Sequence, residues 1–245
     1  MTPARLAAAA ALLLTASCRG CAAARDEVEG GASTRVPIAG PPTPDCALAG
    51  LDRGAVPLVL DTTEGVVRCT LDGARAPRAV AMVAALAQGR AFFLDPTSGA
   101  VVRRPYYENM LVFRAIADGL VQTGCPADNG TGHPGYRLPV EADPTDATRL
   151  ARAGALFLAR YTAPPGRVDP AAPPPGDVIG SQLVVSLTDM SHLAGTVTVL
   201  GACQDLEVVR RISRAVAAKE RRVELRHARV EGAPRGEACP AAASR

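Results

Sequence analysis

One run of residues, 112–136, restricts the possible fold more than any other part of the chain. It alternates short apolar segments with turn residues, a pattern typical of β-strands joined by hairpins and loops. It also places an arginine, Arg114, inside the first apolar segment, where burying an unpaired charge is costly. We therefore expect Arg114 either to have an ion-pair partner or to take part in a functional site.

The hairpin within this run can form in two registers. A two-residue turn would place Arg114 and Gln122 on opposite faces. A three-residue loop, with Gly119 as its left-handed residue, pairs Arg114 with Gln122 instead. That register also sets Ile116 against Leu120. We favour it, because it gathers two long polar side chains beside two apolar ones on one face.

The same run resembles the core of the cyclophilins, the barrel-shaped peptidyl-prolyl cis-trans isomerases. The family pattern is F-H-R-V-I-P-G-F-M-I-Q-G-G-[DC]-P followed by G-T-G-x-P-G-Y, and the matching residues are Arg114, Ile116, Gln122, Gly124, Cys125, Pro126, Gly130, Thr131, Gly132, Pro134, Gly135 and Tyr136. Six further segments resemble parts of the family in the same order: 61–71, 76–89, 95–99 with 105–107, 153–159, 180–187 and 192–201. The resemblance covers about residues 55–231. It implies a mainly β fold, a closed antiparallel β-barrel capped by two α-helices.

Local patterns place the elements of this domain. The expected strands are 56–60, 66–71, 156–159, 183–187, 197–201 and one beginning near Val223. One helix should begin at Pro77, whose missing N–H is harmless in the first turn, and stop at Gly89. A second should cover 206–218, with Asp205 as its N-cap. Residues 90–105 should form a long loop.

The first 24 residues have the form of a secretory signal peptide, with a short basic start, an apolar run and small residues. T-A-S-C at 15–18 resembles a bacterial lipoprotein cleavage box, in which Cys18 would be lipidated. Plain cleavage near residues 22–24 is the alternative. No later apolar run reaches the ~20 residues of a membrane-spanning helix. We expect an exported protein of the periplasm or envelope, with membrane contact only through a lipid anchor.

Composition suggests the remaining boundaries. Residues 25–54 are polar and rich in Gly and Pro, and we expect a flexible tether. Residues 55–231 should form the domain, and 232–245 a disordered tail. The net charge is +3 with charges interspersed, which does not point to nucleic acid. Nothing indicates an obligate oligomer, so we expect a monomer.

Seven cysteines fit export, where disulfides persist. Cys46 and Cys239 flank the domain, and a barrel whose first and last strands pair would bring them together. We therefore expect a disulfide between them. Cys69 and Cys203 are either buried thiols or a second bridge, and Cys125 should be a packed free thiol.

The resemblance implies isomerase chemistry that needs neither metal nor cofactor. An isomerase must bind the twisted X–Pro amide better than either planar form. Arg114 matches the catalytic arginine, which can donate to the prolyl nitrogen. Gln122 would hold the substrate backbone and brace the arginine, and Gln182 matches a second site glutamine. The alternative for Arg114 is an ion pair with one of three carboxylates: Glu141, Asp143 or Asp118.

The proline pocket departs from the family, which usually supplies two phenylalanines, a methionine, a leucine and a histidine. The matching positions here are Gly119, Leu120, Val184, Leu193 and Val197, and we expect Thr131 to contact substrate as well. His192 stands where many members have Trp, and Arg160 where many have Asn. The aromatic walls are lost, which weakens binding by about a kcal/mol or more.

Two functions follow from these features. The first is a prolyl isomerase that assists the folding of exported proteins, with proline-containing peptides or unfolded chains as partners. The second is a non-catalytic cyclophilin-fold module that binds peptides or acts as a chaperone. The proline-rich segment 160–177 could cover the groove and restrict substrates.

Overall fold

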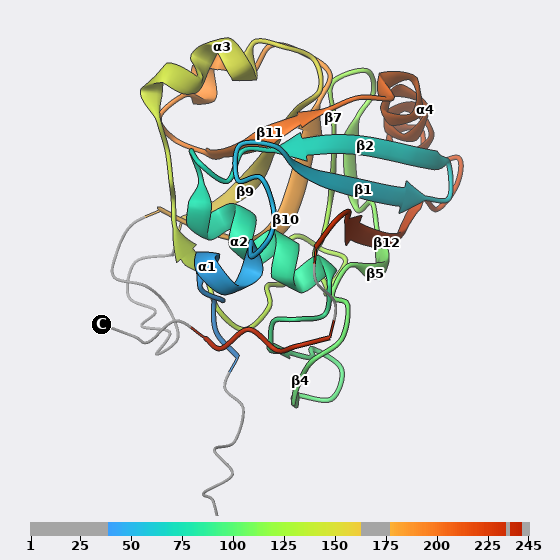
Figure 1. The fold of residues 1–245 in the computed structure, drawn as a ribbon. Helices are drawn as coiled ribbons and strands as arrows, with labels where there is room; N and C mark the ends of the chain where they lie inside the picture. Colours follow the sequence, from blue (N-terminus) through green and yellow to red (C-terminus); the bar gives the residue numbers. More distant parts are fainter. Residues whose placement is uncertain (1–38, 163–176, 234–235, 242–245) are drawn as a thin grey trace, which may run out of the picture. The chain divides into compact units, whose positions relative to one another are not determined.

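The computed structural model describes residues 39–162, 177–233 and 236–241 (Figure 1). The strands along the main path of its sheet are β1 (Val56–Thr62), β2 (Gly65–Leu71), β5 (Glu108–Leu111), β6 (Arg114–Ile116), β7 (Leu120–Thr123), β9 (Ala155–Thr162), β10 (Asp177–Ser186), β11 (Thr198–Cys203) and β12 (Glu224–Val230). Short β8 (Leu138–Pro139) pairs with β10. Within the expected loop 90–105, β3 (Phe93–Leu94) pairs with β4 (Val101–Val102).

The main sheet is antiparallel and follows the order β5-β12-β1-β2-β11-β9-β10-β7-β6. Its edge strands β5 and β6 are separated along the chain only by Val112 and Phe113. The Thr123 hydroxyl of β7 donates to the carbonyl of Leu111 in β5 at 3.0 Å. The sheet therefore curls until its edges come close, which confirms the expected mainly β, cyclophilin-like fold. The expected pairing of the first long strand, β1, with the last, β12, is also present.

Two helices pack on this sheet at separate places (Figure 1). Helix α2 (Pro77–Ala87) lies against β11 and β12, and all its residues from Ala79 onward are buried. It ends as predicted near Gly89, which has φ +66°. Helix α4 (Leu206–Ala217) lies against β2, β6 and β7 with Val209 and Ile212 buried. One hydrophobic core connects the sheet with both helices.

Asp205 does not cap α4 as predicted. It takes a left-handed conformation with φ 55°, and its side chain makes no capping hydrogen bond. Its carboxylate instead accepts a hydrogen bond from the backbone N–H of Arg68 at 3.0 Å. The residue thus ties the start of the helix to strand β2.

The structure also contains short helices that the sequence analysis did not predict. They are α1 (Pro44–Ala47) and α3 (Ala147–Leu150), with the 3-10 turns η1 (Pro144–Asp146) and η2 (Ser191–Leu193). Helix α1 lies beside α2 and belongs to a segment expected to be a tether (Figure 1). Leu48 just after it is 1% exposed, so the packed domain begins before residue 55.

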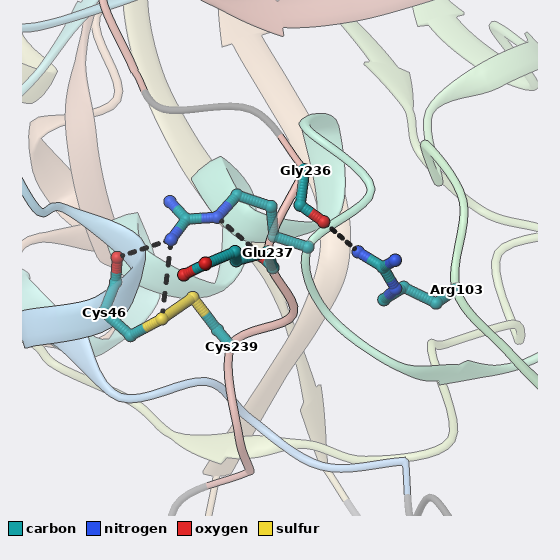
Figure 2. Close-up of a disulfide and its surroundings, with 6 residues drawn as sticks. Cys46, Arg103, Gly236, Glu237 and Cys239 are labelled. Atoms are coloured by element: carbon teal, nitrogen blue, oxygen red, sulfur yellow. Dashed lines mark hydrogen bonds between the residues drawn. A yellow bond between two sulfur atoms is a disulfide. The ribbon is translucent and has the colours of Figure 1, made fainter.

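The C-terminal segment 236–241 is fastened to the domain (Figure 2). The predicted disulfide between Cys46 and Cys239 is present, with the two Cα atoms 5.7 Å apart. Arg90 donates to the carbonyls of Glu237 and Cys46, both at 3.1 Å. Arg103 donates to the Gly236 carbonyl at 2.8 Å. This part of the expected disordered tail is therefore an ordered strap.

The second possible bridge is also formed, between Cys69 and Cys203 of the paired strands β2 and β11. Cys125 is a buried free thiol, as predicted. The predicted signal peptide, with Cys18, lies outside the described residues. Within residues 39–162, 177–233 and 236–241, no helix has the length and apolar character to cross a membrane.

Candidate active site

The hairpin β6–β7 has the register that the sequence favoured. Arg114 pairs with Gln122 and Ile116 with Leu120. The left-handed residue of the loop, however, is Asp118 with φ 54°, not Gly119. Aspartate tolerates this conformation better than most residues. Gly119 is needed for a close approach, since a Cβ there would lie 2.8 Å from a methyl carbon of Ile116.

A chain of hydrogen bonds starts at Arg114. Its Nη1 donates to Oε1 of Gln122 at 3.3 Å, and Nε2 of Gln122 donates to Oε1 of Gln182 at 2.9 Å. Nε2 of Gln182 then donates to the carbonyls of Gly130 and Gly132 at 2.9 and 3.0 Å. The two glutamines are buried and their orientation is fixed, whereas Arg114 is exposed. The arginine is thus held from one side and open to solvent on the other.

The ion-pair interpretation of Arg114 is wrong for all three candidate partners. Asp118 pairs with Arg214 of α4 at 2.9 Å. Asp143 pairs with Arg75 at 2.7 Å. The third carboxylate, Glu141, accepts from backbone N–H groups at the start of α2. In the described part of the chain, Arg114 forms no ion pair, so its anchor is an uncharged amide.

The predicted pocket residues come together beside this chain of hydrogen bonds. Four of them belong to one apolar cluster: Leu120, Val184, Leu193 and Val197. Val184 of β10 is paired with Gln122 of β7 on one side. On its other side it is paired with Phe157 of β9.

Phe157 is a member of this cluster that sequence analysis missed. Its side chain is 5% exposed and packs with Val184 and its neighbours. The only signal was an aromatic residue in the expected strand 156–159. Phe157 supplies aromatic surface next to positions that lack it.

The loop after β7 supports the glutamines. Cys125 Sγ accepts from the N–H groups of Gly130 and Gly132 at 3.2 and 3.3 Å, and the carbonyls of the same two glycines hold Gln182. Burial raises the pKa of the Cys125 thiol, but hydrogen bonds from the surrounding backbone N–H groups outweigh it and leave the pKa below its ordinary value. The Thr131 hydroxyl donates to Asn129 at 2.7 Å, and its contact with substrate stays a prediction.

Tyr161, near the end of β9, is a second residue that sequence analysis missed. Its hydroxyl contacts Nε2 of Gln182 and donates to the Gly132 carbonyl at 3.2 Å. Burial raises the pKa of Tyr161 well above its ordinary value, so the hydroxyl stays protonated. Nothing in the segment R-Y-T indicated this contact, because it depends on the crossing of β9 and the loop.

Other predicted features lie at the edge of the site or elsewhere. His192 and Arg160 are exposed. Most of the proline-rich segment, 163–176, lies outside the described residues, so its proposed cover of the groove stays a prediction. A cavity of about 140 Å³ lies apart, among Phe93, Tyr106 and Met110, and none of the predicted site residues lines it.

Comparison with known proteins agrees with this geometry. The family described as cyclophilin type peptidyl-prolyl cis-trans isomerase/CLD matches residues 58–232. A peptidyl-prolyl cis-trans isomerase A of Mycobacterium tuberculosis is 29% identical over 148 residues, which cover 60% of this chain and 73% of the relative. An isomerase B of Bacillus subtilis is 32% identical over 120 residues, covering 49% and 73%.

A solved cyclophilin-type isomerase of Cryptosporidium parvum has the same fold, with a TM-score of 0.55 and 18% sequence identity. The alignment covers 74% of this chain and 99% of that one. The fold and the site therefore define a cyclophilin-like protein. The chain belongs to the cyclophilin-type peptidyl-prolyl cis-trans isomerase family.

Proposed function

We propose that this protein isomerises X–Pro bonds in exported proteins and thereby assists their folding. The observation that carries the proposal is the chain of hydrogen bonds from the exposed Arg114 through the buried Gln122 to the buried Gln182, placed beside an apolar cluster. The cluster can receive a proline ring, and the arginine can reach the amide next to it. No covalent step is needed.

The chemistry follows from the amide bond. Rotation has a barrier of ~18–20 kcal/mol because the C–N bond has partial double-bond character. Twisting returns a lone pair to the prolyl nitrogen, and a guanidinium placed there donates to the lone pair only in the twisted state. Such a donor, fixed before the reaction, stabilises the transition state without reorganisation. Gln122 fixes Arg114 through a single nitrogen and leaves its other donors for substrate.

The test is cis-to-trans isomerisation of a short X–Pro peptide by the purified protein. Arg114→Ala should lower kcat/KM by about 100-fold or more, the usual effect of losing one such donor. Arg226→Ala, an exposed arginine of β12, is the matched control and should keep its activity. Wild-type activity that survives in Arg114→Ala would contradict the assigned role.

A non-catalytic peptide-binding module is the second candidate, favoured by the aliphatic Val184 and Val197 in the pocket. A folded wild-type protein that binds proline peptides without accelerating their isomerisation would establish this alternative. Binding measured by fluorescence anisotropy, alongside the rate assay, separates the two.

The exported location rests on the signal-like N-terminus and on the two disulfides, which persist in oxidising compartments. We propose lipidation of Cys18 as the anchor. Cys18→Ala should move the protein from the membrane fraction to the soluble envelope fraction. We further propose a monomer, which light scattering of the purified protein would test.

A further inference from the structure

A second positive side chain stands close to the proposed site. Val184, Gln182 and Gly180 are alternate residues of β10, counted toward its N-terminal end. Val184 belongs to the apolar cluster, and Gln182 belongs to the chain of hydrogen bonds. A Cβ at Gly180 would lie 3.6 Å from the ring of Tyr161, whose hydroxyl contacts Gln182. The guanidinium carbon of Arg137 lies 5.1 Å from the centre of the same ring. Tyr161 therefore connects Arg137 to the glutamine of the site.

Arg137 differs from Arg75 and Arg149 in having no carboxylate partner within the described residues. Arg75 and Arg149 both pair with the buried carboxylate of Asp146, at 3.0 and 2.8 Å. Arg137 forms no ion pair within residues 39–162, 177–233 and 236–241, and its Nε is buried without a hydrogen-bond partner. A half-buried guanidinium is normally paired, since removing it from water is costly.

A cation–π contact with the Tyr161 ring holds this guanidinium beside the site. Arginine stacks on aromatic faces through its plane, while its N–H groups point outward along the edge. That edge matches a carboxylate, which can accept two parallel hydrogen bonds. Because Tyr161 also contacts Gln182, a carboxylate bound at Arg137 would lie near a peptide whose proline occupies the apolar cluster.

We propose that Arg137, stacked on Tyr161, binds an acidic side chain of the substrate and so makes this protein prefer prolines with a nearby Asp or Glu. The inference rests on the proposed isomerase function. It assigns Arg137 as a specificity-determining residue and Tyr161 as the residue that positions it.

The test uses peptides with one X–Pro bond that carry Glu, Gln or Lys in turn at each of the three positions before and after the bond. Wild type should show, at one position, a kcat/KM ratio of Glu to Gln peptide of about two to five, the range for a partly exposed ion pair. Arg137→Gln and Tyr161→Leu should both reduce that ratio to near one. Arg229→Gln, which removes the same charge from β12, should preserve it.

A wild-type ratio near one at every position would overturn the inference while leaving the isomerase intact. A ratio unchanged in Arg137→Gln would overturn it as well. If the wild type isomerises none of the peptides, the proposed function fails, and peptide affinity measured by anisotropy decides the inference instead. Tighter binding of the Glu peptide that depends on Arg137 would support it, and equal affinities would refute it.

Discussion

Removing the disulfide between Cys46 and Cys239 should lower the free energy of unfolding by about 4 kcal/mol. In the chain-entropy account, a disulfide stabilises by closing a loop in the unfolded state, and the gain grows with the logarithm of loop length. The two cysteines are 193 residues apart in sequence. A loop of that size alone would correspond to about 5 kcal/mol.

The second disulfide reduces this value, because it lies inside the first. Cys69 and Cys203 remain joined when the outer bridge is removed. The unfolded path between Cys46 and Cys239 then runs across the inner bridge and is only about 60 residues long. A loop of about 60 residues corresponds to about 4 kcal/mol, or a decrease in Tm of about 8–16 °C for a domain of this size.

The measurement is denaturant unfolding followed by far-UV circular dichroism, without reductant, on wild type and on Cys46→Ala/Cys239→Ala. The same pair is then compared in a Cys69→Ala/Cys203→Ala background. In that background the outer bridge should contribute about 1 kcal/mol more to the free energy of unfolding, because the inner bridge no longer shortens the unfolded loop. Arg90→Met, which keeps the bridge but loses the hydrogen bonds to the strap, measures the contribution of native contacts. An outer-bridge contribution that is identical in both backgrounds would refute the loop argument.

Three further perturbations test the fold and the site. Gly201→Ala should destabilise the protein by more than about 3 kcal/mol, measured by thermal melting, because its Cβ would clash with the backbone carbonyl oxygen of Thr70 in the neighbouring strand. Glu64→Gln should lower the free energy of unfolding at pH 7, and this loss should shrink as the pH falls below 4.5. The hydrogen bond from Arg221 holds the pKa of Glu64 below its ordinary 4.5, so the contribution of its charge is present above that value and is lost as the pH falls through the folded-state pKa. Gln122→Met should lower kcat at least about tenfold, because it removes the hydrogen bond that holds Arg114. The circular dichroism spectrum should stay unchanged.

The first two of these perturbations have matched controls. A Cβ at Gly54 would make an ordinary van der Waals contact, 3.5 Å from Oδ1 of Asp52, on an unstrained backbone, so the melting temperature of Gly54→Ala should stay within a few degrees of wild type. Glu207→Gln changes a largely exposed glutamate in a surface ion pair, and its free energy of unfolding at pH 7 should stay within about 1 kcal/mol of wild type. A kcat of Gln122→Met equal to that of wild type would show that Arg114 acts without the hydrogen bond to Gln122.

The sequence predicted those parts of the fold in which local pattern and long-range packing agree. The register of β6–β7 followed from the grouping of Arg114 with Gln122, and the disulfide of Cys46 from the pairing of first and last strands. The prediction failed where one side chain could form either of two hydrogen bonds. Asp205 has the side chain of an N-cap, but the backbone N–H of Arg68 competes for its carboxylate.

The missed site residues share a different cause. Phe157 and Tyr161 lie in β9, and their contacts come from β10 and from the loop after β7, far away in sequence. In sequence alone, an aromatic residue in a strand is more often core than site, so neither stands out. The strap 236–241 was missed because its sequence, G-E-A-C-P-A, has neither a helix nor a strand pattern. The disulfide and hydrogen bonds from Arg90 and Arg103, which come from distant parts of the chain, keep it in place.

The way Arg114 is anchored bears directly on what it can do. A carboxylate partner would offset its charge and occupy its donors, leaving less for a substrate. Here a neutral amide holds one nitrogen, and that amide is fixed through Gln182 to two backbone carbonyls. The loop bearing those carbonyls is tied in turn to the buried sulfur of Cys125. The guanidinium thus has a fixed position and an uncompensated charge, the combination that stabilises a lone pair appearing only in the transition state.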